Sequence, residues 1–323
     1  MQHGPHDADR DHPDCCVAGG EEAATLPVNP YGETSAAATA TERMAEVPGG
    51  SFEMGTDDDV GFPADGEGPR RTVDLDAFHI DRHQVTNAEF YAFVRDTGYT
   101  TDAERFGWSF VFRDFVGPAG REYVLDAADT TSWWVGVEGA NWFRPEGPGS
   151  SVEDRLKHPV VHVSWRDAVE YARWKGKRLP TEAEWERAAR GGLVGKRFPW
   201  GDELHPDGEH RCNIWQGRFP EENTGADGYL GTAPVDAFRQ NGFGMYNVAG
   251  NVWEWCADWF AADHPDGPLA NPTGPADGEE KVIRGGSYLC HDSYCNRYRV
   301  AARSSTGPTS TTGNCGFRCA LDA

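Results

Sequence analysis

Hydrophobic and polar positions first form a regular pattern between residues 73 and 80, and the pattern is that of a β-strand. Four apolar residues in this stretch roughly alternate with polar ones. Successive side chains of a strand point to opposite faces, so the alternation predicts a half-buried strand. Residues 281–284 and 316–321 predict two further short strands.

Three stretches show helical signals with recognisable ends. A capping box, formed by a Thr and a Glu three residues later, opens residues 86–98 and residues 181–190. A serine N-cap opens residues 164–175. Glycines follow the last helical residues of the first and third stretches, as expected for helix ends. We therefore expect three α-helices.

The remaining sequence is irregular. Residues 1–40 mix His, Asp, Pro and small residues without an amphipathic pattern, which predicts a disordered tail. From residue 198 onward, Gly-Asp, Asp-Gly and Asn-Gly pairs predict a series of turns. Neither a fixed-period repeat nor a linker divides the rest. We predict one compact α+β domain over residues 41–323 with little regular secondary structure.

Charge and composition exclude two classes of partner. The net charge of −22 argues against nucleic acid, because phosphate binding requires clustered Lys and Arg. No apolar run approaches the length of a membrane span, and the N-terminus has no apolar signal region. We expect a cytoplasmic protein whose cysteines are mostly reduced. The 12 Trp residues can give a loop-rich fold a solid core.

The candidate chemistry lies at Cys290 and Cys295. His291 follows the first cysteine and Arg297 follows the second by two residues. Cationic neighbours favour the thiolate, which is both the nucleophile and the metal ligand. Residue type and spacing therefore predict a functional thiol pair.

Spacing alone leaves three interpretations of this pair open. The first is a disulfide. The second is a zinc site completed by Cys315 and Cys319, because zinc accepts four thiolates at such spacings. The third is a two-thiolate site for a soft ion, for which Cu(I) is the natural match. Spacing by itself favours zinc or a disulfide over copper.

Four strings, at residues 178–186, 250–255, 282–287 and 316–319, and the segment at residues 286–299 together resemble the formylglycine-generating enzyme family, also called sulfatase-modifying factors. The resemblance covers the chain from about residue 46 to residue 322 and implies a compact, irregular fold distantly akin to C-type lectins. The segment that distinguishes the oxidases is Gly-Ser-Tyr-Leu-Cys-His-Asp-Ser-Tyr-Cys-Asn-Arg-Tyr-Arg at residues 286–299, because non-catalytic paralogues lack its cysteine pair.

The resemblance implies a copper-dependent oxidase. Cys290 and Cys295 would hold Cu(I), and a substrate cysteine would join as a third ligand. With O2 and an external reductant, hydrogen is removed from the substrate Cβ, and the thioaldehyde is hydrolysed to Cα-formylglycine. Trp253 and Ser287 would line the oxygen pocket, and Tyr294 would lie near the copper.

The implied partner is an unfolded sulfatase segment of the form Cys-x-Pro-x-Arg. By the same resemblance, Asn314, Trp108 and Ser109 are expected near this peptide. Trp108 stands where some relatives carry an acid, although its ring could stack on a guanidinium.

The resemblance also implies two structural calcium sites. Calcium takes six to eight oxygen ligands, which Asn, Asp, Glu and backbone carbonyls in tight loops can supply. The residues implied for the first site are Asn213, Ile214, Asp227 and Tyr229, and those for the second are Asn247, Gly250, Val252 and Glu254.

Two alternatives to the oxidase stay open. One is a non-catalytic peptide-binding module of the same fold, stabilised by zinc or by a disulfide at the cysteine pair. The other is a sulfoxide synthase with non-haem iron, but the His-x3-His-x-Glu pattern that it would need does not occur in the sequence.

Overall fold

The computed structural model describes residues 41, 43–127, 131–265 and 267–323. The tail predicted for residues 1–40 lies outside the described residues. Within the described part of the chain, none of the helices has both the length and the apolar character needed to cross a bilayer.

The helices begin and end where local capping dictates. Each α-helix follows a Thr or Ser that accepts the amide of the third helical residue, whose acidic side chain accepts the cap's own amide in return. The three predicted helices are confirmed, whereas α2 was not predicted. The α-helices of the described chain are α1 (Asn87–Thr97), α2 (Asp102–Phe106), α3 (Trp165–Trp174) and α4 (Glu182–Arg190).

Small sheets make up the rest of the regular structure. In strand order they are β1-β4-β15, β13-β12-β10-β14, β11-β3-β2, β5-β7-β6 and β8-β9. The strands are β1 (Met44–Val47), β2 (Gly50–Met54), β3 (Arg71–Leu75), β4 (Phe78–Asp81), β5 (Trp108–Phe112), β6 (Val124–Ala127), β7 (Trp134–Glu138), β8 (Gly217–Arg218), β9 (Glu222–Asn223), β10 (Trp253–Trp259), β11 (Leu269–Ala270), β12 (Lys281–Arg284), β13 (Arg303–Thr306), β14 (Cys315–Gly316) and β15 (Ala320–Asp322). Short 3-10 turns lie at η2 (Pro63–Asp65), η3 (Arg113–Phe115), η4 (Arg121–Tyr123) and η5 (Pro206–Gly208).

Two of the three predicted strands need correction. The alternation over residues 73–80 belongs to β3 and β4, which pair with different neighbours and so lie in different sheets. Residues 316–321 supply the last residue of β14 and the first two of β15, and Arg318 between the strands donates its guanidinium to Glu254. The predicted strand at residues 281–284 is β12.

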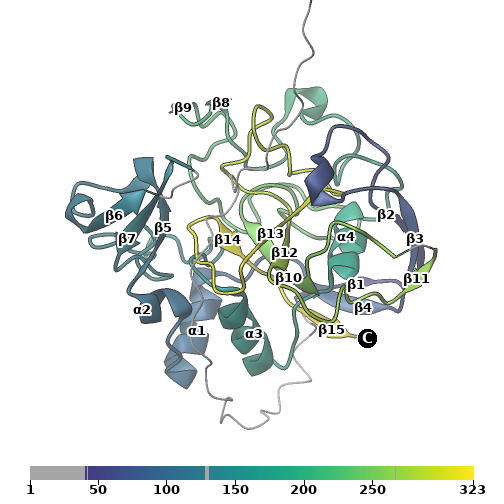
Figure 1. Ribbon diagram of the computed structural model, residues 1–323, viewed down its shortest axis with the longest axis horizontal. Helices are drawn as coiled ribbons and strands as arrows, with labels where there is room; N and C mark the ends of the chain where they lie inside the picture. Colours follow the sequence, from purple (N-terminus) through teal and green to yellow (C-terminus); the bar gives the residue numbers. More distant parts are fainter. Residues whose placement is uncertain (1–40, 42, 128–130, 266) are drawn as a thin grey trace, which may run out of the picture.

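The central sheet carries the site. β10 pairs antiparallel with β12 on one side and parallel with the short β14 on the other. Figure 1 shows this sheet in the middle of the molecule, with the β5-β7-β6 sheet at one side and β2, β3 and β11 at the opposite side. Trp253 and Trp255 of β10 belong to the same buried cluster as Cys290, Cys295 and aromatic residues of α1 and α3. The α+β prediction is confirmed, and the predicted thiols lie inside the main core.

A buried ionic network joins α4 to the central sheet. Arg284 of β12 donates to Glu182 at 2.8 Å and to Glu186 at 2.5 Å, and Arg303 of β13 donates to Glu182 at 2.7 Å. All four side chains are buried. Burial alone would raise the pKa of Glu186, but the charges of Arg190 and Arg284 lower it to about 2.

Candidate active site

Cys290 and Cys295 lie side by side in the core as two thiols. Their sulfurs are 2.9 Å apart, and the residues are 1% and 0% exposed. A disulfide bond is about 2.05 Å long, so no disulfide joins them. A local turn sets this arrangement, because the Cys290 amide donates to the Ser287 carbonyl and the Cys295 amide donates to the His291 carbonyl.

The zinc interpretation is wrong. No group of three or more His, Cys, Asp or Glu side chains in the described ranges could hold a metal ion. Cys315 lies in β14 opposite Trp253, and the amide of Cys319 donates to Asp81. Burial raises the pKa of both thiols well above the usual value.

The cationic neighbours expected from the sequence are engaged elsewhere. The Arg297 guanidinium donates to Asp65 at 2.5 Å and lies over the ring of Phe62 at 4.0 Å. The His291 ring bonds the hydroxyl of Ser293 through Nδ1 at 2.8 Å. Each of these two cations therefore has a hydrogen-bond partner of its own outside the thiol pair.

Ser287, Asn314 and Trp253 come together beside the thiols. The Asn314 amide nitrogen donates to Ser287 Oγ at 3.0 Å, and the Trp253 backbone amide donates to the Asn314 carbonyl at 2.8 Å. Ser287 also donates its backbone amide to the Cys290 sulfur at 3.4 Å. The indole nitrogen of Trp253 is buried and has no hydrogen-bond partner within the described chain. One polar donor of this cluster thus remains available.

Tyr294 belongs to an aromatic cluster next to the thiols. Its hydroxyl donates to the carbonyl of Leu289, which fixes the ring against the cysteine loop. Phe219 stacks on Tyr294 with centroids 3.9 Å apart, and Trp133 meets both rings edge-on. All three rings are half-buried, so they form a partly exposed apolar wall. Trp133 and Phe219 were not predicted, because nothing local in the sequence brings them to residue 294.

Trp108 and Ser109, adjacent in β5, point to different faces. Trp108 is half-buried and meets Phe110 edge-on at 4.9 Å. Ser109 is fully buried, and its hydroxyl contacts His162 Nδ1 at 2.7 Å and the Thr311 carbonyl at 2.8 Å. The structure therefore places Ser109 beneath the loop that carries Asn314, with both of these polar contacts in the interior.

Residues predicted for the first calcium site contact one another in the structure. Both Asp227 oxygens accept backbone amides, from Ile214 and from Tyr229, at 3.0 Å each. The side-chain oxygen of Asn213 is buried without a hydrogen-bond partner in the described structure. Burial raises the pKa of Asp227, which a bound cation would reverse. An orphaned oxygen beside a desolvated carboxylate fits a hard cation.

The second predicted loop fits calcium less well. Asn247 also has a buried side-chain oxygen to which no described residue donates. Glu254, however, accepts hydrogen bonds from Gln84, from Trp185 and twice from Arg318. These four donors use the carboxylate lone pairs, and Arg318 neutralises its charge. Glu254 is therefore an ion-pair partner in this structure.

The two loops touch each other through Gly250. A Cβ at this position would lie 2.1 Å from the Asn213 carbonyl, and its φ of +71° is one that glycine adopts without strain. Asn213 also donates its side-chain amide to Asn251 at 3.2 Å. The close approach explains why the sequence requires glycine here.

Comparison with known proteins places the chain in a family. A family model described as "Sulfatase-modifying factor enzyme 1-like domain" matches residues 31–323. The chain belongs to this family.

Individual relatives differ in their stated activity. The "Formylglycine-generating enzyme" of Thermomonospora curvata is 62% identical over 284 residues, covering 86% of this chain and 93% of the relative. The "Inactive C-alpha-formylglycine-generating enzyme 2" of Bos taurus is 46% identical over 286 residues, covering 88% and 89%. The solved structure of PvdO from Pseudomonas aeruginosa matches with a TM-score of 0.62 at 27% identity, covering 87% and 94%. Because the family holds active and inactive members, activity has to be argued from the site.

Proposed function

We propose that the protein is a copper-dependent oxidase that converts a cysteine of sulfatase polypeptides to Cα-formylglycine. The observation that carries the proposal is the buried pair Cys290 and Cys295, with sulfurs 2.9 Å apart and no disulfide between them. Identity of 62% to a relative named for this activity supports it.

The donor set matches Cu(I). Soft thiolates select Cu(I), whereas zinc sites of the structural kind need four ligands. No described residue supplies a third or fourth His, Cys, Asp or Glu ligand beside the two sulfurs. When bound, Cu(I) supplies the one-electron chemistry that O2 requires.

The surrounding residues orient the reactants. Ser287 and Asn314 form a fixed hydrogen-bonded pair next to the thiols, and the Trp253 indole N–H lacks a described partner. These groups can donate hydrogen bonds to a small polar reactant held beside the pair. The half-buried wall of Tyr294, Phe219 and Trp133 offers an apolar surface for the peptide segment.

The proposed reaction balances with one external reductant. The substrate cysteine loses one hydrogen from Cβ and one from sulfur, giving a thioaldehyde and two electrons. Two further electrons from a reductant complete the reduction of O2 to two water molecules. Water then adds to the thioaldehyde carbon and sulfide leaves, which gives the aldehyde of formylglycine.

The experiment is aerobic incubation of the protein with Cu(I), a reductant and a Cys-x-Pro-x-Arg peptide. The expected product reacts with a hydrazide probe, because it carries an aldehyde. A peptide with Ser in place of Cys is the matched control and should stay unlabelled. Absence of labelling with the cysteine peptide would leave the binding module as the better interpretation.

We propose calcium as a structural ion at the Asn213–Asp227 loop. The orphaned Asn213 oxygen and the half-buried Asp227 carboxylate support it. The second loop is left out of this proposal, because Glu254 is already paired with Arg318.

We further propose that the protein works in a reducing compartment such as the cytoplasm. None of the described cysteines is in a disulfide, although all six are buried in the core. Structural disulfides are common in oxidising compartments and rare in the cytosol.

A further inference from the structure

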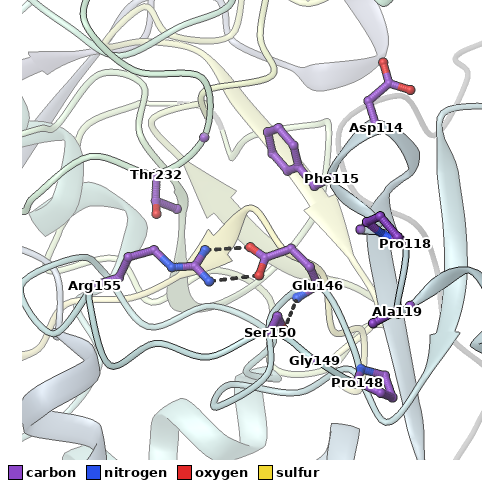
Figure 2. Close-up of a pocket in the computed structure, with 13 residues that line it drawn as sticks. Asp114, Phe115, Pro118, Ala119, Glu146, Pro148, Gly149, Ser150, Arg155 and Thr232 are labelled. Carbon is purple, nitrogen blue, oxygen red and sulfur yellow. Dashed lines mark hydrogen bonds and ion pairs between the residues drawn. The ribbon is translucent and has the colours of Figure 1, made fainter.

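A pocket with an inner extension lies next to the site. The outer pocket has a volume of about 550 Å³, and Figure 2 shows Glu146 and Arg155 facing each other in it, with Phe115 and Thr232 nearby. Their bidentate ion pair has distances of 2.6 and 2.8 Å. An inner cavity of about 40 Å³ has residues in common with this pocket: Phe115, Glu146, Arg155, Gly231 and Thr232.

Two of the residues that line the inner cavity carry an unsatisfied polar atom. The side-chain oxygen of Asn87 and Nε2 of His162 are buried and make no hydrogen bond of normal geometry within the described residues, although the Pro145 carbonyl interacts with the His162 ring. An unsatisfied buried polar atom costs about 1–3 kcal/mol. A volume of about 40 Å³ is ample for one water molecule, which needs roughly 10–15 Å³ by this measure.

His162 sits beneath the loop that ends in Asn314. Its backbone amide donates to the Thr312 carbonyl at 2.9 Å, and its Nδ1 contacts Ser109 Oγ, which in turn donates to the Thr311 carbonyl. A Cβ on Gly313 would lie 3.3 Å from His162 Nε2. One histidine therefore contacts or supports three consecutive residues before Asn314.

The backbone of His162 is held in an unfavourable conformation. Its φ is +57°, a left-handed value that non-glycine residues rarely adopt and that costs roughly 1–3 kcal/mol. Burial lowers the pKa of the ring to about 3, although the carbonyl of Pro145 favours the proton. The imidazole is thus neutral at physiological pH and can both donate and accept a hydrogen bond.

We propose that the inner cavity is a site for ordered water bound by His162 Nε2 and Asn87 Oδ1, and that His162, fixed in this way, positions residues 311–314. The positioned group is Asn314, which bonds Ser287 beside the thiols. The part that concerns catalysis rests on the proposed oxidase function, whereas the water site does not.

A crystal structure tests the water site without any assay. The wild-type structure should show a water within hydrogen-bond distance of His162 Nε2 and Asn87 Oδ1. Gly313→Ala, whose new methyl would project toward Nε2, should displace it. The proposed water site would be contradicted if the wild-type cavity is empty or collapsed in a map that shows other buried waters.

Peptide kinetics test the positioning role. We expect His162→Leu to lower kcat/KM by roughly 10- to 100-fold, mainly through KM, because misplaced positioning groups have effects of this order. His162→Asn should recover much of the loss, since Asn tolerates the left-handed conformation and keeps polar groups. His205→Asn is the matched control, because His205 contacts His210, lines neither cavity and should leave the kinetics unchanged.

The outcomes separate the two proposals. Folded His162→Leu with wild-type kcat/KM would overturn positioning, and so would equal losses in His162→Asn and His162→Leu. If His162→Leu does not fold, Gly313→Ala takes its place and should raise KM. An inactive wild type would refute the oxidase function, and the crystal structure would still decide the water site.

Discussion

Two buried polar regions of this molecule, the ionic network of α4 and the thiol site, are constructed in opposite ways. In the network, Arg284 and Arg303 place their guanidiniums on Glu182 and Glu186, so each buried charge has a counter-charge within 2.8 Å. Around Cys290 and Cys295 the Trp253 indole N–H stays without a described partner.

We expect the ionic network to contribute mainly to stability and the thiol site mainly to function. A buried network whose charges are paired is costly to break, although Nε of Arg284 has no described hydrogen-bond partner. A partly satisfied polar site contributes less to stability and keeps donors for a reactant. Mutations in the two regions should therefore affect different observables.

The largest effect is expected at the thiols. Cys290→Ser and Cys295→Ser should each abolish peptide turnover, since a hydroxyl is a poor ligand for a soft ion. The melting temperature should stay near that of the wild type, because a Ser differs from Cys by one buried atom. Activity would be followed by mass spectrometry of the peptide and folding by calorimetry. Substantial turnover in either variant would contradict the mechanism.

The next largest effect is expected in the ionic network. Glu186→Gln removes one charge and leaves Arg190 and Arg284 under-compensated, which should destabilise the fold by about 3–5 kcal/mol. Asp96→Asn is the matched control, because its pair with Arg95 is exposed and screened by solvent, so its loss should change the stability little. Urea unfolding measures both. If both substitutions lower the free energy of unfolding equally, the buried network stabilises the fold no more than an exposed ion pair does.

Calcium removal should give a smaller effect. A ligand that binds only the folded state at 100 times its Kd stabilises it by about 2.7 kcal/mol. Chelation with EDTA should therefore lower the melting temperature of the wild type. Asp227→Asn should melt at the same temperature with and without EDTA. If EDTA leaves the melting temperature of the wild type unchanged, the calcium proposal is contradicted.

The smallest effect concerns pH. Burial raises the pKa of Asp258 to about 7, because the charge of Glu182 adds to the desolvation. Between its unfolded pKa and about 7 the folded state binds more protons, so the contribution of Asp258 to stability declines as pH rises through this window. Asp258→Asn should show less loss of stability between about pH 5 and about pH 8. If the free energy of unfolding changes with pH equally in the wild type and in Asp258→Asn, the raised pKa of Asp258 is contradicted.

Helix ends were predictable from the sequence because they depend on adjacent residues. The Thr86–Glu89 and Thr181–Glu184 boxes form as expected. Strands were less predictable, since pairing joins distant segments. β10, at the centre of the main sheet, gave no local alternation because most of its side chains are buried on both faces.

Residues of the candidate site were likewise predictable only where they lie close together in the sequence. The thiols, Ser287 and Tyr294 lie within nine residues of sequence, so one segment revealed them. Trp133, Phe219 and His162 reach the site through tertiary contacts. The charge of Arg297 was assigned to the thiols by proximity in sequence, but its carboxylate partner is Asp65, 232 residues away.

The most direct test of the central claim is X-ray absorption spectroscopy of the protein loaded with one equivalent of Cu(I). Copper should be bound by sulfur ligands in the wild type, and that sulfur signal should be lost in the Cys290→Ser, Cys295→Ser double variant. Copper in a nitrogen and oxygen environment, or an unchanged sulfur signal in the double variant, would contradict it.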